Sequence, residues 1–177
     1  VKNSSVMFYD GSLKLSHKIN ERSKLTFSCY TSNDRFSLAD DTTYYWRNLG
    51  GSLRYDNSLS DRLFSSISLT YGNYEYRLRD FDPATSFELK YSILYPSLKV
   101  DFQLDTQHKI SFGFHNTWYE FHPGRLRPGS QLSNVRNVEM PSETSLESAL
   151  YMSDGFDLSE KLYLEVGFRF SVFNRFG

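Results

Sequence analysis

The feature of this sequence that most limits its fold is a strict alternation of apolar and polar residues. After the turn at 159–161, one parity is apolar over twelve residues, while the other carries mostly polar residues and glycine. The apolar parity consists of Leu162, Leu164, Val166, Phe168, Phe170 and Val172. A period of two is typical of a β-strand with one apolar face, and no segment has helical periodicity. The chain is therefore predicted to be all-β.

Seven other segments alternate in the same way. The eight predicted strands cover residues 6–19, 24–36, 43–59, 62–80, 88–104, 109–122, 143–158 and 161–175. Short polar turns lie near 20–24, 60–62, 105–109 and 159–161, and longer loops lie near 37–42, 81–87 and 123–142. Tight turns between alternating runs are typical of hairpins, and these recur at intervals of roughly 40–50 residues. This pattern predicts an antiparallel up-and-down meander of about eight long strands.

Strand length and loop asymmetry favour a membrane setting. The predicted strands are 13–19 residues long, whereas strands of globular sheets usually have ~5–6 and a tilted transmembrane strand needs ~9–11. Outer-membrane barrels combine short periplasmic turns with longer extracellular loops. The sequence therefore predicts part of a larger transmembrane β-barrel in a bacterial outer membrane. A soluble β-sandwich or small-barrel binding module also alternates and remains the alternative.

Strand parity predicts which side chains face lipid and which face the barrel lumen. The expected lipid-facing residues are Leu13, Leu15, Phe27, Leu53, Leu69, Val100, Phe112, Leu150, Leu164, Val166 and Phe168. The expected lumen-facing residues are Lys14, Ser28, Arg54, Ser68, Asp101, Ser111, Glu165 and Arg169. Pro96 falls inside a predicted strand, where its missing N–H predicts a bulge or a change of register.

Charge and composition exclude several function classes. Lysine and arginine total 20 against 21 acidic residues, giving a net charge of −1. Nucleic acid is not an expected partner, because binding phosphate backbones needs a basic surface. Cys29 is the single cysteine, so the sequence holds neither a disulfide framework nor a cysteine-rich metal site. We expect no metal and no cofactor.

Two segments carry a family resemblance. Residues 151–170 read Y-x-x-D-x-F-x-L, a tight turn, then L-x-L-x-x-G-x-R-F, and Phe8-Tyr9-Asp10 opens the first strand. These motifs resemble TonB-dependent outer-membrane receptors, the second one their Bacteroidetes branch. The resemblance implies a 22-stranded barrel closed by a plug. Because the sequence contains no candidate plug and no TonB box, residues 1–177 are expected to form a single β-barrel segment without a plug domain.

The resemblance also implies a function and a set of partners. The segment would be barrel wall of a receptor importing a scarce nutrient of the siderophore, glycan or peptide class. Its partners would be outer-membrane lipid, the remaining barrel strands and plug of the same receptor, the TonB complex through that plug, and a surface lipoprotein.

The topology predicts two open edges. If the short turns are periplasmic, the first and last predicted strands both reach the outside, as expected for an internal fragment of a larger barrel. Strands 6–19 and 161–175 would then pair with strands that this chain does not supply. A standalone eight-stranded outer-membrane barrel, in which these two strands pair with each other, is the alternative.

Five residues are candidates for ligand binding. Tyr44, Trp46 and Tyr76 share the lumen parity of their strands and are able to stack on a sugar or siderophore ring. An aromatic girdle at the membrane interface is the alternative interpretation. Arg125 and Arg127 lie in the longest predicted loop, with Arg136 further along it, and would attract an anionic ligand or lipopolysaccharide phosphates. A solvated loop is the competing interpretation.

No catalytic set is predicted, and the chain is not expected to be an enzyme. Glu120 and His122 share a strand face, but His115 has the other parity, which argues against a metal site. Asp40 and Asp41, near Asp34 in sequence, are interpreted as solvated loop carboxylates rather than a calcium site. A small-barrel enzyme would need a convergent nucleophile or acid–base set, and the serine and histidine spacings provide none.

Overall fold

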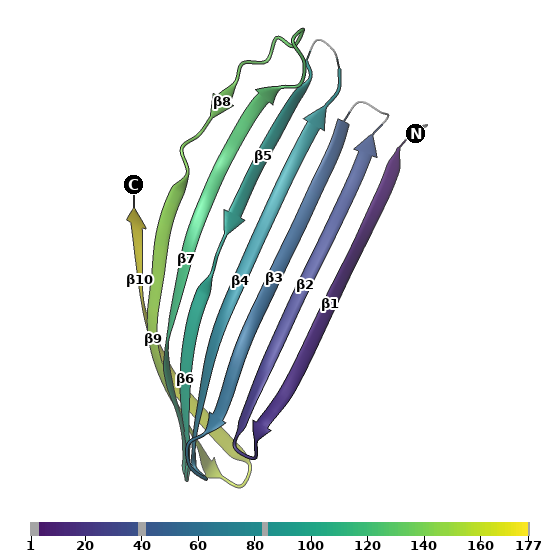
Figure 1. Cartoon of the computed structure of the whole chain (residues 1–177). Coiled ribbons are helices and arrows are strands. Elements are labelled where there is room, and N and C mark those ends of the chain that lie inside the picture. Colours follow the sequence, from purple (N-terminus) through teal and green to yellow (C-terminus); the bar gives the residue numbers. More distant parts are fainter. Residues whose placement is uncertain (1–3, 39–41, 83–84, 177) are drawn as a thin grey trace.

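The computed structural model describes residues 4–38, 42–82 and 85–176, and within them the chain folds into one antiparallel sheet (Figure 1). The strands are β1 (Ser5–Asn20), β2 (Ser23–Leu38), β3 (Thr42–Ser58), β4 (Leu63–Asp80), β5 (Phe87–Leu94), β6 (Ser97–Asp105), β7 (His108–Pro128), β8 (Val138–Glu139), β9 (Glu143–Ser159) and β10 (Leu162–Phe176). The predicted all-β meander is confirmed. None of the described segments is a helix long and apolar enough to cross a membrane.

Neighbouring strands follow the order of the chain. The sheet runs β1-β2-β3-β4-β5-β7-β9-β10, with β6 continuing the line of β5 between β4 and β7. Short turns after β1, β3, β6 and β9 gather at one end, and the connections after β4 and β7 lie at the other (Figure 1). Within the described ranges β1 bonds only to β2 and β10 only to β9. The self-closed eight-stranded barrel is therefore not formed.

The predicted strand 88–104 is two strands, β5 and β6, separated at Tyr95 and Pro96. The amide of Tyr95 still donates to the carbonyl of Gly72, and the carbonyl of Pro96 accepts from the amide of Trp118. The register is the same on both sides, because two residues lie between the flanking pairs on each of the three chain segments: 71–72, 95–96 and 118–119. The expected bulge or register change at Pro96 is therefore wrong: proline removes one donor and the ladder continues around it.

A bulge does occur, in β7. Between the pairs Ser92–His122 and Lys90–Arg125, β7 contains one more residue than β5. The extra residue falls at Pro123-Gly124, where Gly124 has a φ of +154° that side-chain-bearing residues rarely adopt. As a result β7 continues to Pro128, and the loop predicted to begin at 123 begins after the strand instead.

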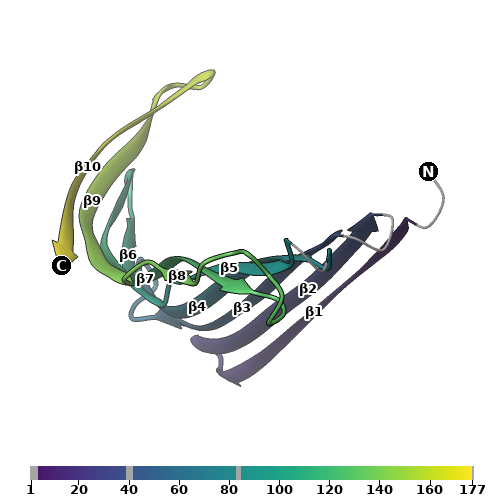
Figure 2. The same cartoon turned by 90° about the horizontal axis from the view of Figure 1, so that it is seen from above.

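The sheet is strongly curved and open. Seen from above, it forms a trough with β1 and β10 at its two edges (Figure 2). Ala149, at 3% exposure, is the one buried hydrophobic residue of the described chain. The soluble-sandwich alternative is therefore wrong for these residues, because a sandwich buries an apolar core between two sheets.

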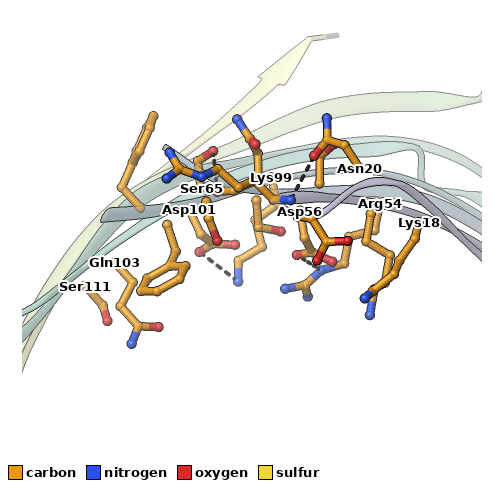
Figure 3. A pocket seen from close by; sticks show the side chains of 18 residues that line it. Lys18, Asn20, Arg54, Asp56, Ser65, Lys99, Asp101, Gln103 and Ser111 are labelled. Carbon is orange, nitrogen blue, oxygen red and sulfur yellow. Dashed lines mark hydrogen bonds and ion pairs between the residues drawn. The ribbon is translucent and has the colours of Figure 1, made fainter. Parts of the chain in front are cut away.

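The two faces of the trough differ in chemistry. Polar side chains near the short turns project from the concave face (Figure 3). Strand alternation then places the predicted lipid-facing residues on the convex face, where Leu150 is 61% and Phe168 66% exposed. We call the convex-face set the apolar band; it comprises Leu13, Leu15, Phe27, Leu53, Ile67, Leu69, Tyr71, Leu98, Val100, Phe102, Phe112, Phe114, Leu150, Met152, Leu164, Val166, Phe168 and Phe170.

Candidate functional site

A continuous row of aromatic rings crosses the concave face in the half of the sheet away from the short turns. We call it the aromatic ladder; its members are Phe36, Tyr44, Trp46, Tyr74, Tyr76 and Tyr91. Ring centroids lie 6.1 Å apart for Phe36–Tyr44, 6.0 Å for Tyr44–Trp46 and 5.8 Å for Trp46–Tyr76. Tyr91 then lies 5.1 Å from Tyr76 and 5.9 Å from Tyr74. Four strands, β2 to β5, contribute to this surface.

Sheet register accounts for the ladder. Phe36 pairs with Tyr44, Trp46 with Tyr76, and Tyr76 with Tyr91. Directly opposed side chains lie ~4.5–5.5 Å apart at Cβ, and aromatic pairs contribute roughly 0.2–1 kcal/mol each. The rings are only partly buried. The ladder therefore offers several adjacent π faces that are already held in place.

The concave face near the short turns is charged instead of aromatic. A groove of about 560 Å³ lies there, and the labelled side chains of Figure 3 line it. Within it Lys99 Nζ lies 3.1 Å from Asp101 Oδ1, and Arg54 Nε donates to Asp56 Oδ1 at 2.7 Å. The hydroxyl of Tyr151 also donates to Asp101. These two ion pairs neutralise part of the charge in the groove, whereas Lys18 and Lys24, which also line it, form no ion pair among the described residues.

The structure brings together three of the five predicted site residues. Tyr44, Trp46 and Tyr76 form the centre of the aromatic ladder. Arg125 and Arg127 lie in β7, not in a loop, and pair across the sheet with Lys90 and Glu88.

The two arginines lie on the convex face, opposite the ladder. Lys90 pairs with Arg77, which follows Tyr76 directly and so points the other way. The bulge causes this placement, because one extra residue exchanges the faces of every later side chain in the strand. The arginines and the aromatic rings are therefore parts of different surfaces.

Sequence reasoning did not assign Phe36, Tyr74 and Tyr91 to the site. The signal was present, because Phe36 and Tyr74 share the parity of the inward residues on their strands. Linking Tyr91 to Tyr76 required the register between β4 and β5, which the predicted meander does not specify.

The described residues contain no group of three His, Cys, Asp or Glu side chains that could hold a metal ion. His122 Nε2 lies 3.2 Å from Glu120, while His115 Nε2 lies 3.3 Å from the Thr117 hydroxyl on the other face. Asp40 and Asp41 lie outside the described residues.

Comparison with known proteins identifies the fold. No family model matches the sequence, and no curated protein is significantly similar to it. Among solved structures, the ferric preacinetobactin receptor BauA from Acinetobacter baumannii has a TM-score of 0.72 at 14% identity, over 99% of this chain and 35% of that one. The copper transporter OprC has a TM-score of 0.75 at 12% identity, over 94% of this chain and 28% of that one.

Two further structures extend this comparison. A variant of the ferric enterobactin receptor PfeA from Pseudomonas aeruginosa has a TM-score of 0.70 at 14% identity, over 97% of this chain and 29% of that one. The translocator domain of the autotransporter NalP from Neisseria meningitidis matches with a TM-score of 0.56 at 10% identity, over 96% of this chain and 61% of that one. These neighbours are outer-membrane β-barrel proteins.

At these identities the likeness concerns the fold alone. The chain has the fold of the barrel wall of TonB-dependent receptors. It spans about a third of the length of the first receptor it matches.

Proposed function

We propose that this chain is an internal wall segment of a TonB-dependent outer-membrane receptor that imports a scarce nutrient. The observation that carries the proposal is the open sheet with an apolar convex face and a charged concave face. Each unsatisfied backbone group in hydrocarbon costs several kcal/mol, so only closed barrels of strands span membranes. The free sides of β1 and β10 therefore need further strands, which the rest of the receptor would supply.

The polar concave face fits the lumen of such a barrel. In this arrangement the short turns are periplasmic, and the connections after β4 and β7 are outer loops. The ion-paired groove near the short turns would face the plug, which in these receptors closes the lumen. TonB would act through that plug, and a surface lipoprotein would meet the outer loops.

The aromatic ladder suggests the class of cargo. It lies on the lumen face above the plug-facing groove, on the route that an entering ligand takes. Aromatic faces bind apolar or planar groups, and binding sites are largely lined by such side chains with a few polar groups for orientation. A siderophore or glycan with a ring able to stack fits this surface best, and a peptide with aromatic side chains is the remaining class.

Cell fractionation and uptake test the proposed function. The full-length protein is expected in the outer membrane as a heat-modifiable barrel, and import of its ligand is expected to stop when TonB is deleted. Import that persists without TonB would contradict the receptor assignment and leave an outer-membrane barrel of another kind.

Fluorine NMR tests the ladder separately. The sequence has two tryptophans, Trp46 in the ladder and Trp118 in β7 with the opposite facing. In full-length protein labelled with 5-fluorotryptophan, the resonance lost in Trp46→Phe should shift when ferric siderophores or oligosaccharides are added. The resonance lost in Trp118→Phe is the internal control and should not move. Equal shifts of both, or of neither with a ligand that is imported, would exclude the ladder as the contact surface.

A further inference from the structure

The convex face changes character above the apolar band. We call the cationic set found there the basic rim; it comprises Arg35, Arg47, Arg77, Arg79, Lys90, Arg125 and Arg127. All seven share the parity of the apolar band on their strands, with the β7 bulge included. The rim occupies the ends of β2, β3, β4, β5 and β7 that lie away from the short turns.

Three cations of the rim stand side by side in one cross-strand row. Arg77 pairs with Lys90, and Lys90 pairs with Arg125. Like charges placed directly opposite in a sheet are destabilising. Glu75 relieves part of the repulsion, since its carboxylate lies 2.8 Å from Arg77 Nη2 and 2.9 Å from Lys90 Nζ. Even so, the Nε of Arg77 is buried without a hydrogen-bond partner.

The rim has more cations than carboxylates. Seven basic side chains share these rows with Glu75, Glu88 and Glu139, which leaves four positive charges uncompensated. The Glu88 carboxylate accepts a hydrogen bond from Arg79 Nε at 2.5 Å. The carboxylate of Glu120, which lies one row closer to the apolar band, is 3.2 Å from His122 Nε2. Among the described residues no ion pair is formed by Arg47, Arg125 or Arg127.

The rim also contains a groove. Arg79, Arg125 and Arg127 line a hollow of about 600 Å³, together with the acidic residues Asp80 and Glu88 and the apolar side chains of Phe81 and Leu132. Phe81 is 55% and Leu132 78% exposed. Guanidinium groups present planar forks of donors that match phosphate oxygens, so the groove combines phosphate-binding groups with apolar surface.

From this arrangement we infer that the basic rim binds the phosphate groups of anionic lipid in the outer leaflet, of the kind that lipid A carries. The inference rests on the proposed function, because it needs the apolar band to lie in the membrane. A bound lipid would place its acyl chains along the band and its phosphates on the rim, supplying the negative charge that the cross-strand row lacks.

Continuity of the rim with the band favours a lipid over free phosphate. Both lie on the same face and on the same strands, separated by the row that contains Leu49 and Leu94. A soluble anion destined for import would instead need cations on the concave face, beside the aromatic ladder. The rim points away from that route.

Native mass spectrometry of the full-length barrel in detergent tests the inference. Diphosphorylated lipid A and its dephosphorylated form are the probes, with inorganic phosphate as competitor. The wild-type barrel should bind the diphosphorylated lipid at least tenfold more tightly than the dephosphorylated one. Millimolar inorganic phosphate should not displace it. Displacement by inorganic phosphate would overturn the lipid assignment in favour of a free anion.

A matched pair of triple variants identifies the surface. Replacing Arg47, Arg125 and Arg127 by Gln removes three rim cations and should weaken lipid binding at least tenfold. Replacing Lys14, Lys18 and Lys24 by Gln removes three cations from the concave face and should leave binding unchanged. Equal losses in both variants, or in neither, would overturn the inference. Heat modifiability, the difference in gel mobility between folded and heat-unfolded protein, reports barrel assembly for each variant. A protein that shows no folded form on the gel would contradict the proposed function, independently of the lipid measurement.

Discussion

At the scale of single residues, glycines on the concave face accommodate tyrosine rings and neighbouring backbone. A Cβ built on Gly113 would lie 2.3 Å from the carbonyl oxygen of Val100 and 2.6 Å from the hydroxyl of Tyr151. Because one of these atoms is backbone, it does not move aside cheaply. Gly113 therefore allows β6 and β7 to approach and Tyr151 to reach Asp101.

Gly113→Ala is expected to destabilise the barrel by about 1–3 kcal/mol, the usual cost of overpacking. Gly50 is the matched control, because it lies on the same face in β3, which has both neighbouring strands, and the nearest atom to a Cβ there is the carbonyl oxygen of Tyr71 at 3.9 Å. Gly50→Ala should be neutral or slightly stabilising, since alanine has less chain entropy to lose. The free energy of unfolding in urea, measured in lipid vesicles, separates the two. Equal effects would show that the contact at Gly113 is not a constraint.

Glu75 is an ionisable residue of the basic rim, outside the apolar band. Burial raises its pKa, but ion pairs with Lys90 and Arg77 outweigh burial and hold the pKa below the ordinary value of 4.5. A carboxylate with a lowered pKa stabilises the fold above its unfolded value, and that contribution is lost as pH falls through the folded value. The rim is thus expected to keep its internal pairs at neutral pH and to lose them only in acid.

Lys90→Gln should move the Glu75 titration to higher pH, because it removes one of the two cations that are paired with the carboxylate. Carbon NMR of the labelled carboxyl group in the assembled barrel measures this midpoint. The Lys99→Gln variant is the control, since Lys99 pairs with Asp101 on the other face. A midpoint unchanged by Lys90→Gln would show that the Glu75–Lys90 pair does not form.

At the scale of elements, alternation decides how a strand tolerates charge. Phe168 lies on the convex face in the middle of β10, and Gln103 lies at a similar depth on the concave face of β6. Phe168→Arg should cost about 2–4 kcal/mol in a bilayer, the value for arginine near the midplane. Gln103→Arg introduces the same side chain on the polar face and should cost little. Refolding yields and unfolding free energies in vesicles compare the two, and equal stability would contradict the assigned facing.

Parity explains what sequence could predict about these elements. Unbroken alternation in β3 and β4 was enough to place Tyr44, Trp46 and Tyr76 on one face. Parity did not place Arg125 and Arg127, which were predicted to lie in a loop, because the Pro123-Gly124 sequence is equally typical of a turn and of a bulge within a strand. Tertiary pairing with β5 decides between them. Pro96 shows the opposite case, in which a strong breaker is accommodated because the strands on both sides keep their partners.

At the scale of the whole molecule, the two free edges determine where the fold is stable. In the full-length receptor, β1 and β10 should exchange amide hydrogens as slowly as β3, because further strands pair with them. The 177-residue chain alone in detergent should keep protection in β3 and β4 and lose it in β1 and β10. Hydrogen exchange read by mass spectrometry makes this comparison. Full protection of both edges in the isolated chain would indicate closure by another route, within one chain or between copies.

The meander and its open edges were predictable because each hairpin is local in sequence. The partners of β1 and β10 were not, because strand alternation carries no information about which strands lie beyond an edge.

The bulge at Pro123-Gly124 makes the upper part of β7 sensitive to a change of one residue in length. Deleting either residue would restore the parity of the lower strand and rotate Arg125 and Arg127 through half a turn. Both guanidinium groups would then leave the outer wall and face the passage beside Trp46 and Tyr76. Deleting the codon of either residue would therefore transfer two anion-binding side chains from the lipid-facing surface to the ligand passage, with no substitution elsewhere in the strand. Insertions and deletions at this position deserve the same scrutiny as substitutions when related barrels are compared.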